Sequence, residues 1–571
     1  MRRLIQAQSA SRGLALGRAR IREPHGLEIG EEHIDAARVD DELARLHQAI
    51  DRAREELATL RDRLHGAIAQ EIGEFLDLHA MLLDDPELLT ALDRLIRDDG
   101  FSAAYALKLQ RDRLVAVFDG MDDPYLRSRR EDIDHVIGRV HAALQRRDSD
   151  AVQGLAGDVL VADSVAPSEI AQLAERGIVA IVTAQGSPLS HSAILARSLH
   201  LPLVVGAHEA LAQVNDGEAM MVDGRSGEVI VEPHAADLRH FRQRKRESQR
   251  EQDRLATLKK KATRTKDGVD IRLFANAESR EDMAQAHDLG ANGIGLYRTE
   301  FLFLQRDELP DEEEQFRVYR DVVLGMRGRP VTIRSLDLGA DKADKTGLVS
   351  SGEPNPALGV RGVRLSLRHR QVFRTQLRAV LRASGYGPIR LLVPMISSRD
   401  EIRAVRAEFV ACARDLRTEG HEITDHLELG AMIEVPAAAL ALPRMIADME
   451  FISIGTNDLV QYLLAADRNN DALGDLYSPL HPAVLRLLHD VIKLGHKHGR
   501  RVLVCGEIAA DPAMTRLLLA LGLTDFSLHP GSMLEVRQII RDSDHHDLRR
   551  HASALLRAPD REAIERAMSR L

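Results

Sequence analysis

The segment from residue 267 to residue 571 alternates eight short, largely apolar runs with longer helical stretches. The runs are IRLFAN, GIGLYR, VTIRSLD, IRLLVPM, LGAMIEV, FISIG, RVLVCG and DFSL. Eight parallel strands with a helix after each, over about 300 residues, are the pattern of a closed (β/α)8 barrel. We therefore predict a multidomain α/β protein that ends in a (β/α)8 barrel.

The positions just after these runs carry polar side chains. In a (β/α)8 barrel the chemistry takes place at the C-terminal ends of the strands, where the following loops meet. The residues at these positions include Asn276, Arg298, Glu300, Arg334, Asp337, Glu434, Asn457, Asp458, Cys505, Glu507 and His529. A random set of strand ends would not collect so many polar groups, so we expect the active site at this end of the barrel.

Four arginines are expected near this end, two of them at strand ends and two in the loops beyond. They are Arg298, Arg334, Arg361 and Arg468. A guanidinium group binds phosphate and carboxylate through two parallel hydrogen bonds. Several such groups in one barrel mouth predict a small substrate with several negative charges. The alternative is that each arginine simply pairs with a neighbouring acidic side chain.

Two acidic residues, Glu434 and Asp458, end successive strands. Two carboxylates, with water and substrate phosphate completing the octahedron, are the usual way in which proteins hold Mg²⁺. Cysteines and histidines do not cluster with the spacing of a zinc site. The pattern therefore predicts Mg²⁺ as the cofactor, because the metal and the arginines together would neutralise the charge of the substrate.

Cys505 follows the run RVLV and precedes Gly506. A thiol at a strand end of the barrel can supply or remove a proton near neutral pH. The alternative is an inert buried residue, which is the common role of a lone cysteine. Cys412 lies in the helical stretch EFVACARDL, and we assign it to packing.

The composition of the chain excludes several classes of protein. Its 571 residues carry a net charge of −10, and aromatic residues make up 3% with no Trp, which argues against polyanion binding and base stacking. Two cysteines exclude a disulfide framework. No apolar run approaches the ~20 residues of a membrane helix, and the first residues lack the apolar stretch of a signal peptide. We expect a cytoplasmic enzyme that binds neither nucleic acid nor a membrane.

Changes in sequence texture divide the chain into four parts. Residues 26–147 contain little Gly or Pro and repeat apolar residues at three- and four-residue spacing, which predicts an all-helical block. Short β-branched runs predict that residues 1–25 and 148–235 form one α/β domain, into which the helical block is inserted. The charged stretch 236–266 predicts a solvated linker helix, and residues 267–571 form the barrel.

The α/β domain holds a second candidate site. The run HSAILARSL is expected to be a helix, which places Ser190 or His191 at its start. The free N–H groups and the positive dipole end of a helix favour phosphate, and a histidine there can act as a nucleophile. The alternative is that Ser190 only caps the helix and that His191 has no role.

These motifs together resemble a known family. The segments that match are, in the family's order, LSHSAILARSLHLPLVVG, GLYRTEFLF, SLDLGADK, NPALGVRGVR, PMISS, IEVPAAA, SIGTNDLVQY, DRNND and VCGEIAADP. They are similar to enzyme I of the bacterial phosphoenolpyruvate:sugar phosphotransferase system. The resemblance covers essentially the whole chain.

The resemblance implies a phosphoenolpyruvate–protein phosphotransferase. In this family phosphoenolpyruvate binds at the barrel mouth with Mg²⁺, the residue matched by His191 attacks its phosphorus, and the residue matched by Cys505 protonates the departing enolpyruvate to give pyruvate. The helical domain docks the phosphocarrier HPr, which receives the phosphoryl group and drives sugar uptake. The histidine domain swings between the two sites, and the protein is a homodimer through its barrels.

Carried over residue by residue, the resemblance implies two sets of site residues. The substrate-binding residues are Arg298, Arg334, Arg361, Asn457, Asp458 and Arg468. The Mg²⁺ ligands are Glu434 and Asp458.

The sequence departs from the family pattern around the histidine. The family usually has Gly-Gly-x-Thr-Ser-His, whereas this chain has GSPLSH, ending at His191. Leu189 lacks a hydroxyl that could form a hydrogen bond worth about 0.5–1.5 kcal/mol, so transfer is expected to be slower but not abolished. Pro188 stiffens the loop. Two milder differences are Ser335 in place of Thr and Ala340 in place of Gly.

Other functions stay open at this point. Phosphoenolpyruvate synthase and pyruvate phosphate dikinase share the histidine domain and the barrel, but they also need a nucleotide-binding domain, and no P-loop pattern is present. A regulatory paralogue with a nitrogen-type carrier is a further alternative. An interaction protein with a decayed barrel is the last one, and the intact set of barrel-mouth residues argues against it.

Overall fold

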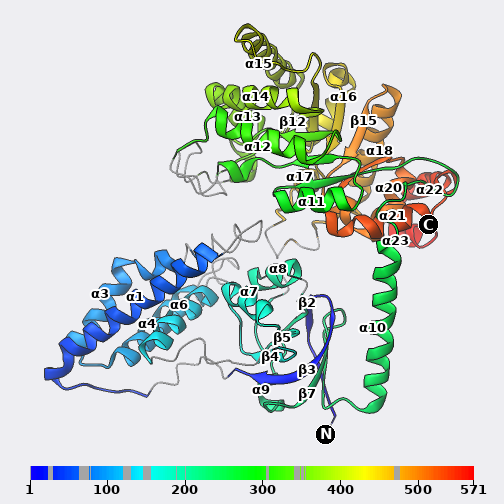
Figure 1. The fold of residues 1–571 in the computed structure, drawn as a ribbon. Coiled ribbons are helices and arrows are strands. Elements are labelled where there is room, and N and C mark those ends of the chain that lie inside the picture. Colours follow the sequence, from blue (N-terminus) through cyan, green and yellow to red (C-terminus); the bar gives the residue numbers. More distant parts are fainter. Residues whose placement is uncertain are drawn as a thin grey trace. The chain divides into compact units, whose positions relative to one another are not determined.

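The computed structural model divides the chain into two compact units, residues 1–250 and residues 251–571 (Figure 1). The described residues are 2–22, 30–63, 76, 79–119, 130–145, 156–187, 190–199, 201–303, 308–339, 347–348, 353, 355–468, 473 and 476–571. Among them, no helix is both long enough and apolar enough to cross a membrane. Each unit is described by itself.

The second unit contains a closed barrel of eight parallel strands, which run in chain order from β9 to β16 and close back onto β9. The strands are β9 (Arg272–Ala277), β10 (Ile294–Tyr297), β11 (Val331–Arg334), β12 (Ile389–Val393), β13 (Glu428–Ile433), β14 (Phe451–Ile454), β15 (Arg501–Val504) and β16 (Asp525–Leu528). Each strand coincides with one of the eight predicted runs. The predicted fold class is therefore confirmed.

Helices follow the strands and cover the outside of the barrel. A typical start is that of α15 (Arg399–Thr418), where the side chains of Ser398 and Glu401 each accept a hydrogen bond from the other's backbone N–H. Cys412 is buried in this helix, in the packing role that we predict for it. The other helices are α11 (Arg280–Asp288), α12 (Glu312–Gly325), α13 (Val363–Arg368), α14 (Arg370–Ala383), α16 (Pro436–Met445), α17 (Thr456–Leu464), α18 (Pro482–Lys497), α19 (Glu507–Ala510), α20 (Thr515–Leu521), α21 (Met533–Arg541), α22 (His545–Arg557) and α23 (Arg561–Met568).

The interior of the barrel is a packed core. Alternate residues along each strand point inward, and the residues between them point toward the helices. Gly430 makes room for the ring of Phe451, because a Cβ at this position would lie 2.4 Å from Phe451 Cζ. One interior cluster comprises Phe274, Leu296, Leu392, Met432, Phe451, Leu503 and Cys505. Since this core fills the barrel, the ends of the strands are left for chemistry.

The first unit is built on one eight-stranded sheet with the order β1-β8-β7-β3-β4-β5-β6-β2. The three N-terminal strands belong to this sheet although the helical block separates them from the others in sequence, as predicted for an insertion. The strands are β1 (Arg3–Gln6), β2 (Gln8–Ser11), β3 (Leu14–Ile21), β4 (Val159–Ala162), β5 (Ala180–Thr183), β6 (Leu203–Val205), β7 (Ala219–Asp223) and β8 (Glu228–Val231). The helices between them are α7 (Pro167–Glu175), α8 (His191–Ser198) and α9 (Ala210–Gln213).

The inserted block is helical, as the apolar spacing predicts. Its helices pack side by side through buried leucines such as Leu46, Leu92 and Leu107. They are α1 (Val39–Arg63), α3 (Pro86–Arg97), α4 (Ala103–Asp119) and α6 (Arg130–Leu144). Most of the predicted helical stretch AIAQEIGEFLDL lies outside the described residues.

The predicted linker helix is α10 (Ala235–Ala256), which ends ten residues before the predicted end at residue 266. Its first half packs on the sheet of the first unit, where Phe241 is buried against β7 and β8. Beyond the helix, the carbonyls of Leu258 and Lys259 accept hydrogen bonds from Nη1 of Arg537 in α21, at 2.8 and 2.9 Å. These bonds hold the chain in a turn and explain why the helix stops early.

Candidate functional site

The barrel mouth is organised around the carboxylate of Asp337, which follows β11. Arg361 binds this carboxylate with two parallel hydrogen bonds, from Nε to Oδ1 at 3.0 Å and from Nη2 to Oδ2 at 2.8 Å. Nη1 of Arg334 lies 3.3 Å from Oδ2 of Asp337. Asp337 is only 2% exposed, and a buried charge is stable only when it is paired in this way. One acid therefore holds two of the predicted arginines.

Arg334 is the last residue of β11 and has a second acidic partner. Its Nη2 donates to Oε1 of Glu300 at 3.0 Å, and the same oxygen accepts the backbone N–H of Asp337 at 3.0 Å. Burial disfavours the charged guanidinium, but Glu300 and Asp337 outweigh this effect and raise the pKa of Arg334 above its usual value. Nε of Arg334 is buried without a hydrogen-bond partner among the described residues.

Asp458, in the first turn of α17, lies between two of the arginines. Its Oδ2 is 3.4 Å from Nη2 of Arg361, and its Oδ1 is 3.8 Å from Nη1 of Arg468. Oδ1 is buried, and no described residue forms a hydrogen bond with it. A buried carboxylate oxygen that lacks a donor is suited to a cation.

Glu434 directly follows β13 and is 1% exposed. Its Oε1 accepts the backbone N–H of Met395 at 2.6 Å. Met395 has a φ of 59°, in the left-handed region that favours glycine. Burial, followed by the nearby carboxylates of Asp458 and Asp337, raises the pKa of Glu434 well above its usual value. A cation held between Glu434 and Asp458 would oppose this rise.

Each of the four predicted arginines has an acidic neighbour. This is the pairing expected if the arginines only neutralise nearby acidic side chains. Arg298 pairs with Glu278, and its side chain is 46% exposed. The acidic side chains around the four arginines are Glu278, Glu300, Asp337, Glu434 and Asp458. Among the described residues, these acidic side chains offset the positive charge of the four guanidinium groups. A cation bound beside Glu434 and Asp458 would add positive charge for an anionic substrate.

The two carboxylates Glu434 and Asp458 fit Mg²⁺ better than they fit a transition metal. Within the described ranges, no group of three or more His, Cys, Asp and Glu side chains is arranged to hold a metal ion. Mg²⁺ needs only one or two carboxylates, because it keeps water and binds substrate phosphate at its other positions. The unsatisfied Oδ1 of Asp458 and the raised pKa of Glu434 fit such an ion.

Asn457 lies beside Asp458 in α17 and has a fixed orientation. Its Nδ2 donates to Oε1 of Glu507 at 3.0 Å, and its Oδ1 accepts the backbone N–H of Glu507 at 3.0 Å. The hydroxyl of Tyr477 donates to its carbonyl at 3.1 Å. These bonds hold the predicted amide at the rim of the barrel.

Cys505 follows β15 and belongs to the interior cluster. Its Sγ donates to the carbonyl of Ile454 at 3.4 Å, and its own carbonyl accepts from Nδ2 of Asn276 at 3.2 Å. Burial raises the pKa of the thiol to about 11. The thiol therefore carries its proton near neutral pH, which is the form that a general acid requires.

His191 is the first residue of α8 in the first unit. Ser190 is its N-cap, and the Ser190 hydroxyl accepts the backbone N–H of Ala193 at 3.2 Å. The prediction of a capped helix start is thus correct, and His191 lies where the free N–H groups of the helix are found. Pro188, Leu189 and Ala340, which differ from the family pattern, lie outside the described residues. Ser335 is buried beside Arg334.

The sequence does not single out two further side chains near the mouth. The hydroxyl of Tyr462 in α17 accepts from Nη1 of Arg361 at 3.3 Å and donates to the carbonyl of Ala357. Nothing in the sequence marks this contact, because the two side chains lie 101 positions apart. Ser453 in β14 is fully buried. The run FISIG could have indicated Ser453, because a polar residue there occupies a position that points into the barrel.

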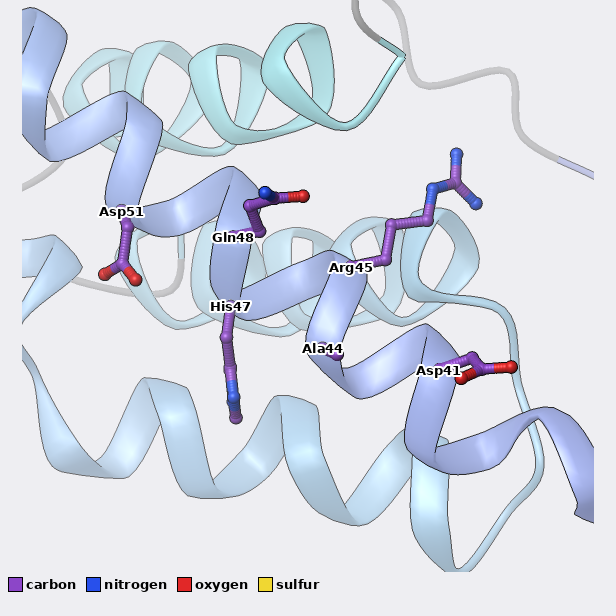
Figure 2. Close-up of a pocket in the computed structure, with 6 residues that line it drawn as sticks. All are labelled: Asp41, Ala44, Arg45, His47, Gln48 and Asp51. Carbon is purple, nitrogen blue, oxygen red and sulfur yellow. The ribbon is translucent and has the colours of Figure 1, made fainter.

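The helical block carries a shallow hollow on the surface of α1. Figure 2 shows its lining side chains pointing in different directions. Nε2 of His47 lies 3.0 Å from Oδ1 of Asp93 in α3, whereas Nη2 of Arg45 donates to the carbonyl of Leu144 in α6. The hollow is therefore a surface feature and not a reaction centre. The residues that line it are Asp41, Ala44, Arg45, His47, Gln48 and Asp51.

Three family models match the chain in succession. Residues 6–129 match the PEP-utilising enzyme, N-terminal model. Residues 154–227 match the PEP-utilising enzyme, mobile domain model. Residues 252–545, just over half of the chain, match the PEP-utilising enzyme, PEP-binding domain model. The last match contains the barrel and every polar side chain of its mouth described above.

Curated relatives align along nearly the whole chain. A phosphoenolpyruvate-protein phosphotransferase of Cupriavidus necator is 42% identical over 576 residues, which cover 98% of this chain and 98% of the relative. One of Geobacillus stearothermophilus is 39% identical and covers 93% of this chain and 92% of the relative. A solved structure titled as Enzyme I (nEIt) is 27% identical and covers 43% of this chain and 99% of its own, with a TM-score of 0.36.

Proposed function

The chain belongs to the family of phosphoenolpyruvate–protein phosphotransferases, and from that premise we propose the reaction that its residues carry out. The phosphoryl group of phosphoenolpyruvate passes to His191, pyruvate is released, and the group then passes to a histidine of an HPr-type phosphocarrier, which drives sugar uptake. The observation that carries this proposal is the buried carboxylate pair, Glu434 and Asp458, set among four arginines in a barrel mouth.

Three of the arginines, Arg298, Arg334 and Arg468, bind the substrate together with Asn457 in this proposal. Phosphoenolpyruvate has a carboxylate and a phosphate, and both groups match the fork of a guanidinium. Nε of Arg334 is buried and has no hydrogen-bond partner among the described residues, so it is a donor that a substrate oxygen could satisfy. Arg298 and Arg468 have partly exposed side chains and turn from their acidic partners toward the substrate. Arg361 stays on Asp337 and keeps Asp458 in place.

Glu434 and Asp458 hold Mg²⁺ in this proposal. The metal, when bound, draws negative charge from the oxygens of the substrate. The backbone N–H of Met395 orients the Glu434 carboxylate, and Arg361 orients that of Asp458. The unsatisfied Oδ1 of Asp458 and the raised pKa of Glu434 support this assignment, because a bound cation would compensate both.

The imidazole of His191 is the nucleophile. It attacks phosphorus, the bond between phosphorus and the enol oxygen breaks, and the electron pair remains on the enolate. The start of α8 stabilises the resulting phosphohistidine through its N–H groups. The match of residues 154–227 to a model described as a mobile domain supports a domain that carries His191 between barrel and carrier. The linker helix α10 connects this domain to the barrel.

Cys505 protonates the enolate on carbon, and its replacement by Ala tests this role. We expect pyruvate formation by the Cys505→Ala variant to fall by about 10²–10⁴-fold, the usual contribution of a general acid. Phosphoryl exchange between His191 and the carrier should remain close to the wild-type rate, because that step uses no carbon acid. Rapid-quench measurement of both steps provides the comparison. Equal losses in the two steps would exclude the acid role.

The helical block and the barrel surface are assigned to partners. We propose that residues 26–147 dock the carrier and that two chains associate through their barrels. The barrel exposes large apolar side chains, among them Val410, Leu440 and Leu476. Single exposed apolar side chains are normal on a protein surface, so these alone do not mark an interface. The dimer proposal rests on the family of the chain, and sedimentation of the intact chain measures it directly.

A pyruvate-release assay tests the whole reaction. With Mg²⁺ and phosphoenolpyruvate but without a carrier, we expect a burst of one pyruvate per chain, because His191 is then filled. Addition of an HPr-type carrier should convert the burst into continuous turnover. Steady turnover that requires ATP instead of a carrier would favour a synthase or dikinase. No burst and no turnover would mean that the barrel is inactive.

A further inference from the structure

Ser453 lies beside the thiol of Cys505 inside the barrel. It occupies an inward position of β14, two residues after Phe451 of the interior cluster, and it is fully buried. The parallel register pairs Ser453 with Leu503 and Ile454 with Val504. Cys505 follows directly and donates both its backbone N–H and its Sγ–H to the carbonyl of Ile454. Ser453 and Cys505 therefore lie on adjacent strands, with Cys505 two positions beyond the partner of Ser453, and the Ser453 hydroxyl is close enough to lower the pKa of the thiol.

The hydroxyl of Ser453 has no hydrogen-bond partner among the residues that the structure describes. A buried hydroxyl without a partner destabilises a fold, so the position of this one beside a proposed general acid calls for an explanation. The thiol beside it already donates to Ile454 at 3.4 Å. While Cys505 is protonated, its sulfur offers the Ser453 hydroxyl only a weak acceptor.

The situation changes once the thiol has given up its proton. The carbonyl oxygen of Ile454, which accepts from the thiol, would repel the thiolate that remains. Glu434 also disfavours the thiolate, whereas the charges of Arg334 and Arg298 favour it. The Ser453 hydroxyl favours the thiolate as well and partly offsets the burial that raises the pKa of Cys505.

We propose that Ser453 is a positioning residue for the proton transfer, whose hydroxyl turns to donate to the Cys505 thiolate as that thiolate forms. This inference rests on the proposed function. This hydrogen bond is weak while the thiol is protonated and becomes strong once the thiolate forms. An interaction that strengthens as the reaction proceeds accelerates it, because it stabilises the starting state less.

The step balances without a further reagent. The enolate left by phosphoryl transfer uses its C=C electron pair to form a C–H bond at C3, and a lone pair of its oxygen restores the C=O bond. The S–H bond of Cys505 breaks, and its electron pair stays on sulfur. The hydroxyl of Ser453 keeps its own proton and only donates a hydrogen bond. After pyruvate leaves, water supplies a proton to the thiolate.

The test is the exchange of pyruvate methyl hydrogens with deuterated solvent. The holoenzyme with Mg²⁺, phosphorylated on His191, is mixed with pyruvate, and NMR follows deuterium at C3. We expect Ser453→Ala to slow this exchange by about 10- to 100-fold, the loss of one hydrogen bond to a charged group. The rate of carrier phosphorylation from phospho-His191 should not change.

Thr515→Val is the matched control. Thr515 is also fully buried, and its hydroxyl also lacks a partner within the described ranges, but it begins α20 on the outside of the barrel. The control should exchange hydrogens at the wild-type rate. Neither variant should unfold at a lower temperature, because each loses only an unsatisfied hydroxyl.

Three results would overturn the proposal. Exchange by Ser453→Ala within twofold of wild type is the first. A lowered unfolding temperature in that variant, with the control unaffected, would indicate a purely structural role. A further loss when Ser453→Ala is added to Cys505→Ala would mean that the hydroxyl does not act through the thiol. If the wild-type chain takes no label from phosphoenolpyruvate on His191, it is the proposed function that fails.

Discussion

Replacement of Glu434 by Gln is expected to slow the phosphorylation of the chain by phosphoenolpyruvate by at least about 10³-fold, or roughly 4 kcal/mol of transition-state stabilisation. The amide keeps the size of the side chain and an oxygen that accepts from Met395 N–H. It removes the negative charge that holds the proposed Mg²⁺. Rapid-quench labelling of Glu434→Gln at saturating Mg²⁺ measures the loss, and the reverse transfer from phosphorylated carrier to His191 should not change.

The same substitution should not weaken the metal-free fold. Burial and the neighbouring carboxylates raise the pKa of Glu434, so the fold favours the neutral form of this side chain. The matched control is Glu408→Gln in α15, a carboxylate that is 6% exposed and paired with Arg370 and Arg374 away from the mouth. We expect the control to lose about 1–2 kcal/mol of unfolding free energy and to keep its activity. Full activity of Glu434→Gln would remove this residue from the metal site.

The barrel could be predicted from the sequence because each of its strands can be recognised within a short stretch of residues. Each strand is a short apolar run with a helix after it. Eight such units are the number that forms a closed (β/α)8 barrel. The side chains that end these strands could be named for the same reason. Glu434 and Asp458 follow successive strands, and strand ends meet at one mouth.

The pairing within the mouth could not be predicted. The sequence places Arg334 and Glu300 at neighbouring strand ends, but it does not say that Arg334 and Arg361 share the carboxylate of Asp337. These contacts depend on loop paths and on a single backbone torsion, such as the positive φ of Met395 that directs its N–H to a carboxylate. The balance of charge in the mouth follows from them.

The end of the linker helix also depended on a distant residue. Composition favours a helix as far as residue 266, because the stretch is charged and contains neither Gly nor Pro. The helix ends at Ala256, and the carbonyls just beyond it accept hydrogen bonds from Arg537. Arg537 lies 279 positions after Leu258 in the sequence. A pattern in neighbouring residues gives no information about a contact between residues so far apart in the sequence. Such contacts often decide where a helix ends, which is why the predicted ends of helices are less accurate than their positions.

Replacement of His191 by Ala should reduce phosphorylation of the chain to background. The imidazole at the start of α8 is the proposed acceptor of the phosphoryl group, and alanine offers no nucleophilic atom in its place. Binding of phosphoenolpyruvate to the barrel should persist, because every proposed substrate-binding residue lies in the second unit. Calorimetric titration of His191→Ala with phosphoenolpyruvate and Mg²⁺ distinguishes the lost acceptor from a damaged barrel.

The most direct test locates the label. Wild-type chain is incubated with Mg²⁺ and phosphoenolpyruvate carrying radioactive phosphorus, and the acid-labile label is then mapped by peptide. We predict one phosphoryl group per chain on the peptide that contains His191, and none on the His191→Ala chain. Undiminished acid-labile label on the His191→Ala chain, or label on a barrel peptide of the wild type, would contradict the account.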